Sequence, residues 1–248
     1  MKNARWIVFW VCLVVLVGSL VAIWSTAQQR AEALRGWELA TETQNLPYRL
    51  PLAGVNVELT QYTPEELSAE LERIAAVGLT WVRQPFLWSA IEPERGHWAW
   101  DTYDALVAAV TAHEGLKLVA VLDGTPPWAR HELAPEHPYA PPASVSEFGR
   151  FAGAVAERYA GQIDYYQVWD EPNLKLHWGG LDPRPAHYAA MLREAYIAIH
   201  AADATATVIA AGLAPTVETG PDNLSDVLFL RALYELGAGA YFDAAAGK

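Results

Sequence analysis

Cysteine and basic residues are scarce in this sequence. Cys12 is the only cysteine among 248 residues, so no disulfide can form within the chain and cysteine gives no evidence on the redox compartment. The chain has 17 Lys and Arg against 29 Asp and Glu, a formal net charge of −12. A nucleic-acid partner requires a basic surface that displaces counterions from phosphates. The composition therefore argues against nucleic acid and leaves neutral ligands, sugars among them, open.

Motifs for phosphate or metal binding are also missing. The sequence has no G-x-G-x-x-G and no G-x-x-x-x-G-K segment, which argues against a nucleotide cofactor. His131-Glu132 and Glu136-His137 lack the helical H-E-x-x-H spacing, and Pro135 interrupts them. We therefore expect no cofactor and no metal, and we predict a solvated loop around these histidines.

One long uncharged segment is present near the N-terminus. Residues 6–29 carry no charge, and about 20 apolar helical residues cross a hydrocarbon core of roughly 30 Å. Lys2 and Arg5 precede the segment, which favours a cytoplasmic N-terminus and an exported remainder. We predict a transmembrane helix over residues 7–24 that anchors a domain outside the cytoplasm. Ser25-Thr26-Ala27 would also serve as a signal-peptide cleavage site, so secretion after cleavage is the alternative.

The rest of the chain divides into a linker and one domain. We assign residues 1–27 to the anchor or signal segment, 28–51 to a polar stalk and 52–248 to a folded domain. In that domain, strand-length apolar runs alternate with helix-period stretches, which is typical of βαβ units in a parallel sheet. Predicted strands lie at 53–59, 80–84, 116–122, 163–169, 206–213 and 240–242, and predicted helices at 64–77, 102–113, 145–159, 186–201 and 223–237.

Two architectures share this alternation, the doubly wound sheet and the (β/α)8 barrel. The first strand–helix turn, Glu58–Tyr62, contains no glycine-rich loop. Barrel enzymes build their sites from the C-terminal ends of many strands. Polar and aromatic residues gather in that position here: Arg83, Trp88, Asp123, Trp128, Asp170, Glu171 and Asn173. We therefore predict an α/β fold of the (β/α)8 TIM-barrel type that is incomplete, with about six strands.

The most informative segment places two adjacent carboxylates at the end of the fourth predicted strand. It reads Trp169-Asp170-Glu171-Pro172-Asn173. Glycoside hydrolysis needs a carboxylic acid that protonates the leaving oxygen and later deprotonates water. An Asp before Glu-Pro could equally start a helix, with the Asp as cap and the Pro in the first turn. The residues by themselves leave both interpretations open.

This segment resembles the W-N-E-P-N motif of the large (β/α)8-barrel clan of retaining glycoside hydrolases, which includes cellulases, β-xylosidases and exopolysaccharide glycosidases. The resemblance extends over about Ala53–Phe242 and includes further motifs in the same order: Gly54-Val55-Asn56, Trp81-Val82-Arg83, Trp88–Pro93, Gly96–Asp101 and Thr125–Ala129. It implies that Glu171 is the catalytic acid/base and that the substrate is an oligo- or polysaccharide.

The sequence departs from the family pattern at two places. Asp170 stands where the family usually has an Asn that donates to a sugar hydroxyl, and an ionised carboxylate can only accept. The family's nucleophile is a Glu at the end of strand seven, whereas the sequence given stops at or just after strand six. We therefore expect the nucleophile to be missing from this chain and the chain alone to show little turnover.

Further substrate contacts are predicted around Glu171. Asp170 and Asn173 flank it, and Arg83 could orient the catalytic carboxylates or pair with a structural acid. Three tryptophans lie in loops where an indole could stack on a sugar ring or instead fill the barrel rim: Trp88, Trp128 and Trp178. The leading hypothesis is hydrolysis of O-glycosidic bonds. The alternative is a non-catalytic, membrane-tethered carbohydrate-binding protein.

Overall fold

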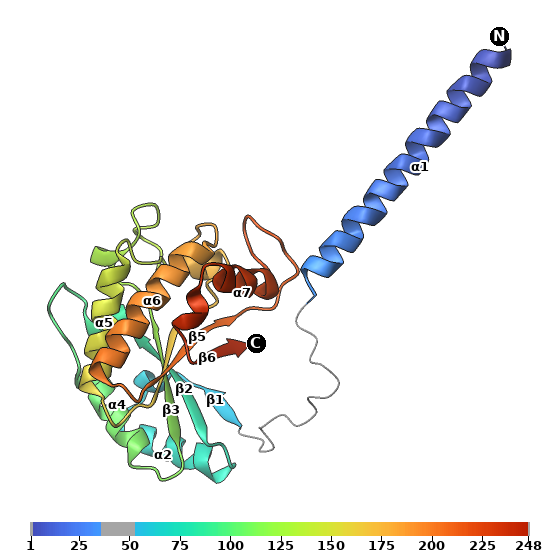
Figure 1. The fold of residues 1–248 in the computed structure, drawn as a ribbon. Helices are drawn as coiled ribbons and strands as arrows, with labels where there is room; N and C mark the ends of the chain where they lie inside the picture. Colours follow the sequence, from blue (N-terminus) through green and yellow to red (C-terminus); the bar gives the residue numbers. More distant parts are fainter. Residues whose placement is uncertain (1, 36–52, 248) are drawn as a thin grey trace. The chain divides into compact units, whose positions relative to one another are not determined.

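The computed structural model describes residues 2–35 and 53–247 of the chain (Figure 1). The chain separates into two compact units, Met1–Thr43 and Gln44–Lys248. The boundary between them falls inside the predicted stalk, most of which lies outside the described residues.

The first unit contains a single described helix, α1 (Lys2–Ala33). It extends beyond the predicted span of 7–24 at both ends, because charged and polar residues with good helix propensity continue it past residue 27. Its apolar side chains are exposed, Val14 by 69% and Ile23 by 66%. Phe9–Ala33 is long and apolar enough to cross a membrane.

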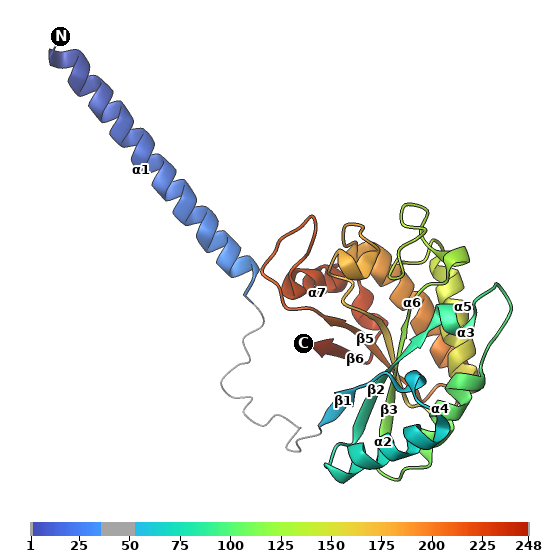
Figure 2. The same cartoon turned by 180° about the vertical axis from the view of Figure 1, so that it is seen from behind.

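The second unit is built on six parallel strands whose order in the sheet follows their order in the chain. The strands are β1 (Gly54–Asn56), β2 (Trp81–Leu87), β3 (Lys117–Asp123), β4 (Tyr165–Asp170), β5 (Thr207–Leu213) and β6 (Ala244–Gly247). A doubly wound sheet would reverse its strand order at a switch point. The observed order and the curled sheet with helices outside it (Figures 1 and 2) confirm the predicted incomplete (β/α)8 barrel.

The predicted helices are present, and their ends differ from the predicted ends by at most three residues. They are α2 (Pro64–Ala76), α4 (Asp101–Thr111), α5 (Val145–Arg158), α6 (Pro185–Ala202) and α7 (Asp226–Glu235), with a short additional α3 (Trp88–Ile91). Thr63 and Glu66 form a reciprocal capping box at the start of α2. Ser144 precedes α5, but its side chain makes no capping hydrogen bond.

The position predicted for the sixth strand was wrong. Residues 238–240 form the 3-10 helix η4 (Ala238–Ala240), and the strand begins four residues after the predicted start. Asp243 fixes this register, because its backbone N–H donates to the Val208 carbonyl and its carboxylate accepts from the Val208 N–H, both at 2.8 Å. Ala244–Gly247 contains no β-branched or aromatic residue, so nothing in this segment of the sequence indicates a strand.

Helices α5 and α6 lie side by side on the sheet (Figure 1). They approach closely at Gly149, where an added Cβ would lie 3.0 Å from Cβ of Glu194. Beneath the C-terminal strand ends is a layer of fully buried aromatic rings, in which Trp88 stacks on Phe151 with centroids 5.3 Å apart. This packed layer gives the loops above it a rigid support.

Candidate active site

The backbone at the end of β4 adopts an uncommon conformation. Trp169 and Glu171 have φ angles of 67° and 48°, a region that non-glycine residues seldom occupy and that costs on the order of 1–3 kcal/mol each. Tertiary contacts hold it in place. The buried Trp169 indole donates to the His177 carbonyl at 3.0 Å, and the Glu171 N–H donates to the Gly212 carbonyl at 3.0 Å.

Glu171 lies against a histidine from the same loop. Its Oε2 is 3.2 Å from Nε2 of His177, with the two side chains 17% and 27% exposed. His177 belongs to the 3-10 helix η3 (Leu176–Trp178), and the Tyr139 ring stacks on it with centroids 5.1 Å apart and planes inclined by 17°. The sequence did not single out His177 or Tyr139, since no periodic pattern links loop residues across two loops.

The alternative interpretation of this segment as a helix start is wrong. After Glu171 the chain makes a turn closed by the Leu174 N–H donating to the Glu171 carbonyl at 3.0 Å. The next α-helix, α6, begins only at Pro185. The carboxylates at 170 and 171 therefore cap no helix.

Arg83 joins three strands at the centre of the site. Its Nη2 donates to Oδ1 of Asp170 at 2.8 Å, and its Nε donates to Oε1 of Gln167 at 3.0 Å. Its Nη1 lies 3.3 Å from Oδ1 of Asn56 at the end of β1. Both members of the ion pair are mostly buried, with side chains 23% and 19% exposed. Charge-assisted pairs of this kind fix the position of the carboxylate.

Asp123 at the end of β3 brings a further carboxyl group to the same edge. It is 7% exposed, and the Gly124 N–H donates to its Oδ1 at 2.6 Å. Burial raises the pKa of Asp123 to about 7; the charge of Asp170 adds to this, while the Gly124 hydrogen bond and Arg83 oppose it. The sequence placed Asp123 after the third strand but gave no reason to rank it with Glu171.

The structure does not support substrate contact for Asn173. This side chain is fully buried. Both amide hydrogens are used, since Nδ2 donates to the carbonyls of Ala214 and Leu224 at 2.9 Å each. Its Oδ1 accepts from the Ala214 N–H at 3.0 Å. Asn173 instead connects the loops that follow β4 and β5.

Two of the three tryptophans predicted to contact sugar are part of the core. Trp88 is 0% exposed and Trp178 is 1% exposed, so neither presents a ring face for stacking. Trp88 packs on phenylalanines of α5, and Trp178 packs on Trp169 with centroids 5.7 Å apart. The burial of these two rings favours the rim-filling interpretation, because a large amphipathic ring is stabilised by burial at the base of a loop.

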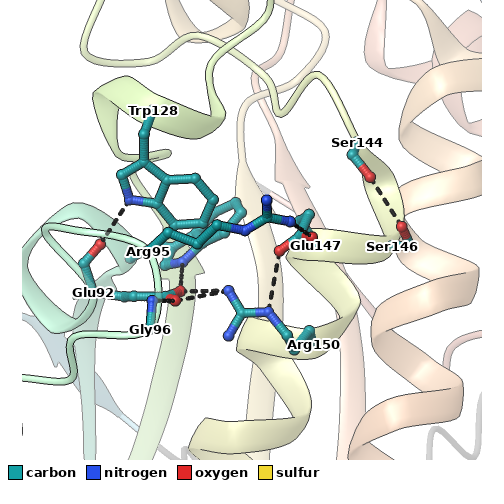
Figure 3. Close-up of polar contacts among 9 residues, drawn as sticks. Glu92, Arg95, Gly96, Trp128, Ser144, Ser146, Glu147 and Arg150 are labelled. Atoms are coloured by element: carbon teal, nitrogen blue, oxygen red, sulfur yellow. Dashed lines mark hydrogen bonds and ion pairs between the residues drawn. The ribbon is translucent and has the colours of Figure 1, made fainter.

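Glu92 organises the contacts around Trp88 (Figure 3). The Glu92 carboxylate is 0% exposed and accepts from Trp88 Nε1 at 2.7 Å and from the Gly96 N–H at 2.7 Å. Arg150 of α5 donates from Nη2 to both carboxylate oxygens, at 2.8 and 2.7 Å. Glu92, the acidic residue of the Ile91-Glu92-Pro93 segment, therefore has a structural role, since its carboxylate oxygens accept hydrogen bonds from Trp88, Gly96 and Arg150.

Trp128 lies at the edge of this network. It is half-buried in the 3-10 helix η2 (Pro127–Ala129), and its Nε1 donates to the Glu92 carbonyl at 3.2 Å. The Arg95 guanidinium carbon lies 5.7 Å from the centroid of its ring. Trp128 therefore keeps part of its surface accessible, unlike the other two tryptophans.

No protein-family model and no curated protein matches the chain. Solved structures do match. A family 39 glycoside hydrolase from Bacteroides cellulosilyticus WH2 aligns with 78% of this chain and 37% of its own, at 21% identity and a TM-score of 0.57. A monomeric β-xylosidase from Caulobacter crescentus CB15 aligns with 79% of this chain and 40% of its own, at 16% identity and a TM-score of 0.58.

A third structure, from family 5 of the glycoside hydrolases, is of a Streptomyces cattleya protein in complex with Manβ1-4GlcNAc. It aligns with 65% of this chain and 44% of its own, at 18% identity and a TM-score of 0.52. The chain thus spans less than half the length of these three proteins. The predicted resemblance to the (β/α)8-barrel glycoside hydrolases is confirmed at the level of the fold.

Proposed function

We propose that this chain carries the acid/base half of a retaining O-glycoside hydrolase site, with Glu171 as the general acid and base. The observation that carries the proposal is the position of Glu171. It is mostly buried at the C-terminal end of β4, on strained backbone, and within 3.2 Å of an imidazole nitrogen. A carboxyl group fixed in this way on a strand end is pre-organised for proton transfer. The glycoside hydrolases that share the fold support the same reaction class.

In the proposed reaction, the Glu171 carboxylic acid gives its proton to the glycosidic oxygen while a nucleophilic carboxylate attacks the anomeric carbon. The bond from that carbon to the leaving oxygen breaks, and its electron pair stays on the oxygen. The resulting carboxylate of Glu171 then takes a proton from water, whose oxygen attacks the same carbon and releases the nucleophile. A retaining mechanism places the two carboxyl groups about 5–5.5 Å apart, and the second of them is the nucleophile that the proposed reaction requires.

Asp170, Arg83 and Trp128 are the proposed substrate contacts. The ion pair with Arg83 holds Asp170 in place, and we propose that its carboxylate accepts a hydrogen bond from a sugar hydroxyl. Trp128 has the accessible ring surface that a pyranose ring could cover. The substrate class is a β-linked oligo- or polysaccharide.

We also propose that α1 tethers the domain to a membrane with residues 52–248 outside the cytoplasm. The support is the length and apolar character of Phe9–Ala33, together with Lys2 and Arg5 ahead of it. In the proposed topology, the domain is exposed to extracellular polysaccharide.

The replacement Glu171→Gln tests the catalytic proposal in the full-length protein. Turnover of unactivated glycosides should fall by roughly 10²–10⁴-fold, because general acid catalysis is lost. Aryl glycosides with good leaving groups should lose much less in the first step, and the covalent intermediate should accumulate. Added azide should partly restore turnover, since it attacks without a base.

Glu132→Gln, an exposed glutamate in the loop after β3, is the matched control and should leave both substrates unaffected. Equal losses on both substrate types without azide rescue would contradict the role of Glu171. Sugar binding without any turnover by the unmodified protein would instead support the carbohydrate-binding alternative.

A further inference from the structure

A separate pocket lies between the loop after β3 and the segment that leads into α6. It encloses about 220 Å³ and is lined by residues that include His131, Pro141, Trp178, Leu181, Arg184 and His187. Clefts that hold drug-sized ligands measure roughly 300–1,000 Å³. This pocket therefore suits a single ring-sized unit rather than a long chain segment.

The two loops meet because of a glycine at one specific position. Gly179 has a φ of +73°, and an added Cβ there would lie 2.7 Å from Cα of Ala140. Only glycine allows both the conformation and the approach. Trp178, which lines the pocket, directly follows His177, the residue in contact with Glu171. The pocket therefore lies on the loop that also carries the proposed acid/base contact.

The two histidines offer one donor and one acceptor. Nδ1 of His131 accepts from the Leu133 N–H at 3.3 Å, so in the neutral ring the hydrogen is on Nε2. The His187 ring donates to the Pro142 carbonyl, and burial lowers the pKa of His187, with His131 and Arg184 adding to the effect. His187 is therefore neutral at neutral pH and keeps a lone pair on its other nitrogen.

The geometry of this pair fits a sugar. The ring centroids of His131 and His187 are 6.2 Å apart, a separation that lets the two rings contact neighbouring hydroxyls of one ligand. A hydroxyl group both donates and accepts, so vicinal hydroxyls match a donor beside an acceptor. Pro141 and Leu181 contribute apolar surface to the lining, which suits the C–H faces of a pyranose ring.

We propose that this pocket is a second carbohydrate subsite that holds one neutral pyranose unit, with His131 donating to one sugar hydroxyl and His187 accepting from its neighbour. The proposal rests on the proposed function, because it assigns the unit to the same oligosaccharide that Glu171 would cleave. It gives His131, from the loop predicted to be solvated, a binding role together with His187 of α6.

Binding measured by NMR on the full chain in detergent micelles tests the proposal directly. The probes are β-1,4-linked xylohexaose, cellohexaose and mannohexaose. On titration with at least one of them, the ring Cε1–Hε1 signals of His131 and His187 should shift together, and the signal of His137 should not. The signals are assigned from the single variants. No shift at His131 and His187 with any of the three probes would overturn the proposal.

Variants that keep the ring but remove its nitrogens test the hydrogen bonds. His131→Phe and His187→Phe should each weaken binding of the responding hexasaccharide by roughly three- to twelvefold, the effect of one neutral hydrogen bond. His137→Phe is the matched control, since it lies on the same loop outside the pocket lining. Unchanged affinity in both pocket variants, or equal loss in the control, would also overturn the proposal.

Failure of the subsite and failure of the proposed reaction give different results. Glu171→Gln should leave the histidine shifts intact, because the pocket lining does not include residue 171. Histidine shifts together with a Glu171→Gln variant that shows neither leaving-group dependence nor azide rescue would support the subsite while contradicting the role of Glu171. Turnover that depends on Glu171 without histidine shifts would contradict the subsite alone.

Discussion

Nε2 of His177 lies 3.2 Å from Oε2 of Glu171, and the Tyr139 ring covers the imidazole from the neighbouring loop. The His177 carbonyl accepts the indole hydrogen of Trp169, so the backbone of the histidine is tied to the strained end of β4. The carboxyl group and its partner are thereby held by one connected set of contacts. We therefore propose that His177 positions the proposed acid/base.

Replacement of His177 should reduce catalysis selectively. In the full-length protein, His177→Ala should lower kcat/KM for unactivated glycosides roughly tenfold, the effect of about one lost hydrogen bond. Aryl glycosides with good leaving groups should be affected less, because their departure needs little protonation. His177→Gln keeps a donor and should recover most of the activity. Equal loss on both substrates, without recovery by Gln, would assign His177 a structural role only.

Asp123 should make the barrel domain less stable as the pH rises from about 4 to about 7. Its pKa is raised to about 7 in the folded domain and is about 3.9 in an unfolded chain. The folded state therefore holds a proton that the unfolded state has released, and the free energy of unfolding falls across this window, by up to roughly 4 kcal/mol. Urea unfolding of Asp123→Asn at several pH values should show a flatter curve and greater stability above about pH 7.

Asp104 serves as a control, because its effect on the pH dependence of stability has the opposite sign. Its hydrogen bond with Arg158 lowers the pKa of Asp104, so its contribution to stability is present at neutral pH and disappears as the pH falls below the usual range of an aspartate. Asp104→Asn should therefore lose a little stability at neutral pH and nothing in acid. Parallel pH curves for the native chain and Asp123→Asn would contradict the assignment of the proton to Asp123.

Arg150→Met should destabilise the domain strongly. It leaves the Glu92 carboxylate, which is 0% exposed, without its cationic partner. Breaking a buried pair costs roughly 3–5 kcal/mol, and we expect the lower end because Arg150 is itself 39% exposed. Arg95→Met is the matched control, since Arg95 is 68% exposed and pairs with Glu147 at the surface. Its free energy of unfolding should change by less than about 1 kcal/mol. Similar losses in both variants, seen by chemical denaturation, would be inconsistent with a buried anion at Glu92.

The N-terminal helix should keep the protein in the membrane fraction after alkaline carbonate extraction. Leu16→Arg places a charge near the middle of the apolar run, which costs roughly 2.5–3.5 kcal/mol at the centre of a spanning helix, and should increase the extracted fraction. Leu236→Arg, at an exposed position in the second unit, is the control and should change nothing. Recovery of a soluble product that begins near Gln28 would show that the segment is cleaved instead.

Local patterns were enough to predict the alternation of strands and helices, and the polar residues after several strands favoured the barrel over a doubly wound sheet. Apolar runs of strand length and helix-period stretches located five strands and the helices between them, because the residues of each element define the surface that it buries. The capping box of Thr63 and Glu66 likewise forms between neighbouring residues. The position predicted for the sixth strand was wrong because Ala244–Gly247 has no side chains that are typical of a strand. Its register is set by pairing with β5.

The candidate site could be predicted from the sequence only in part. The strand pattern placed Arg83, Asp123, Asp170 and Glu171 at the same edge, because parallel strands bring their carboxyl ends together. Which side chains meet there was decided by tertiary packing.

The folded chain brought His177 and Tyr139 to Glu171 and buried Trp88 and Trp178. It also used both amide hydrogens of Asn173 on backbone carbonyls. Contacts between loops far apart in the chain leave no periodic trace in a sequence. The burial of an aromatic ring depends on what covers it. The sequence by itself therefore determined which elements form and at which end the polar residues collect, and only the tertiary structure decided which of them contact one another.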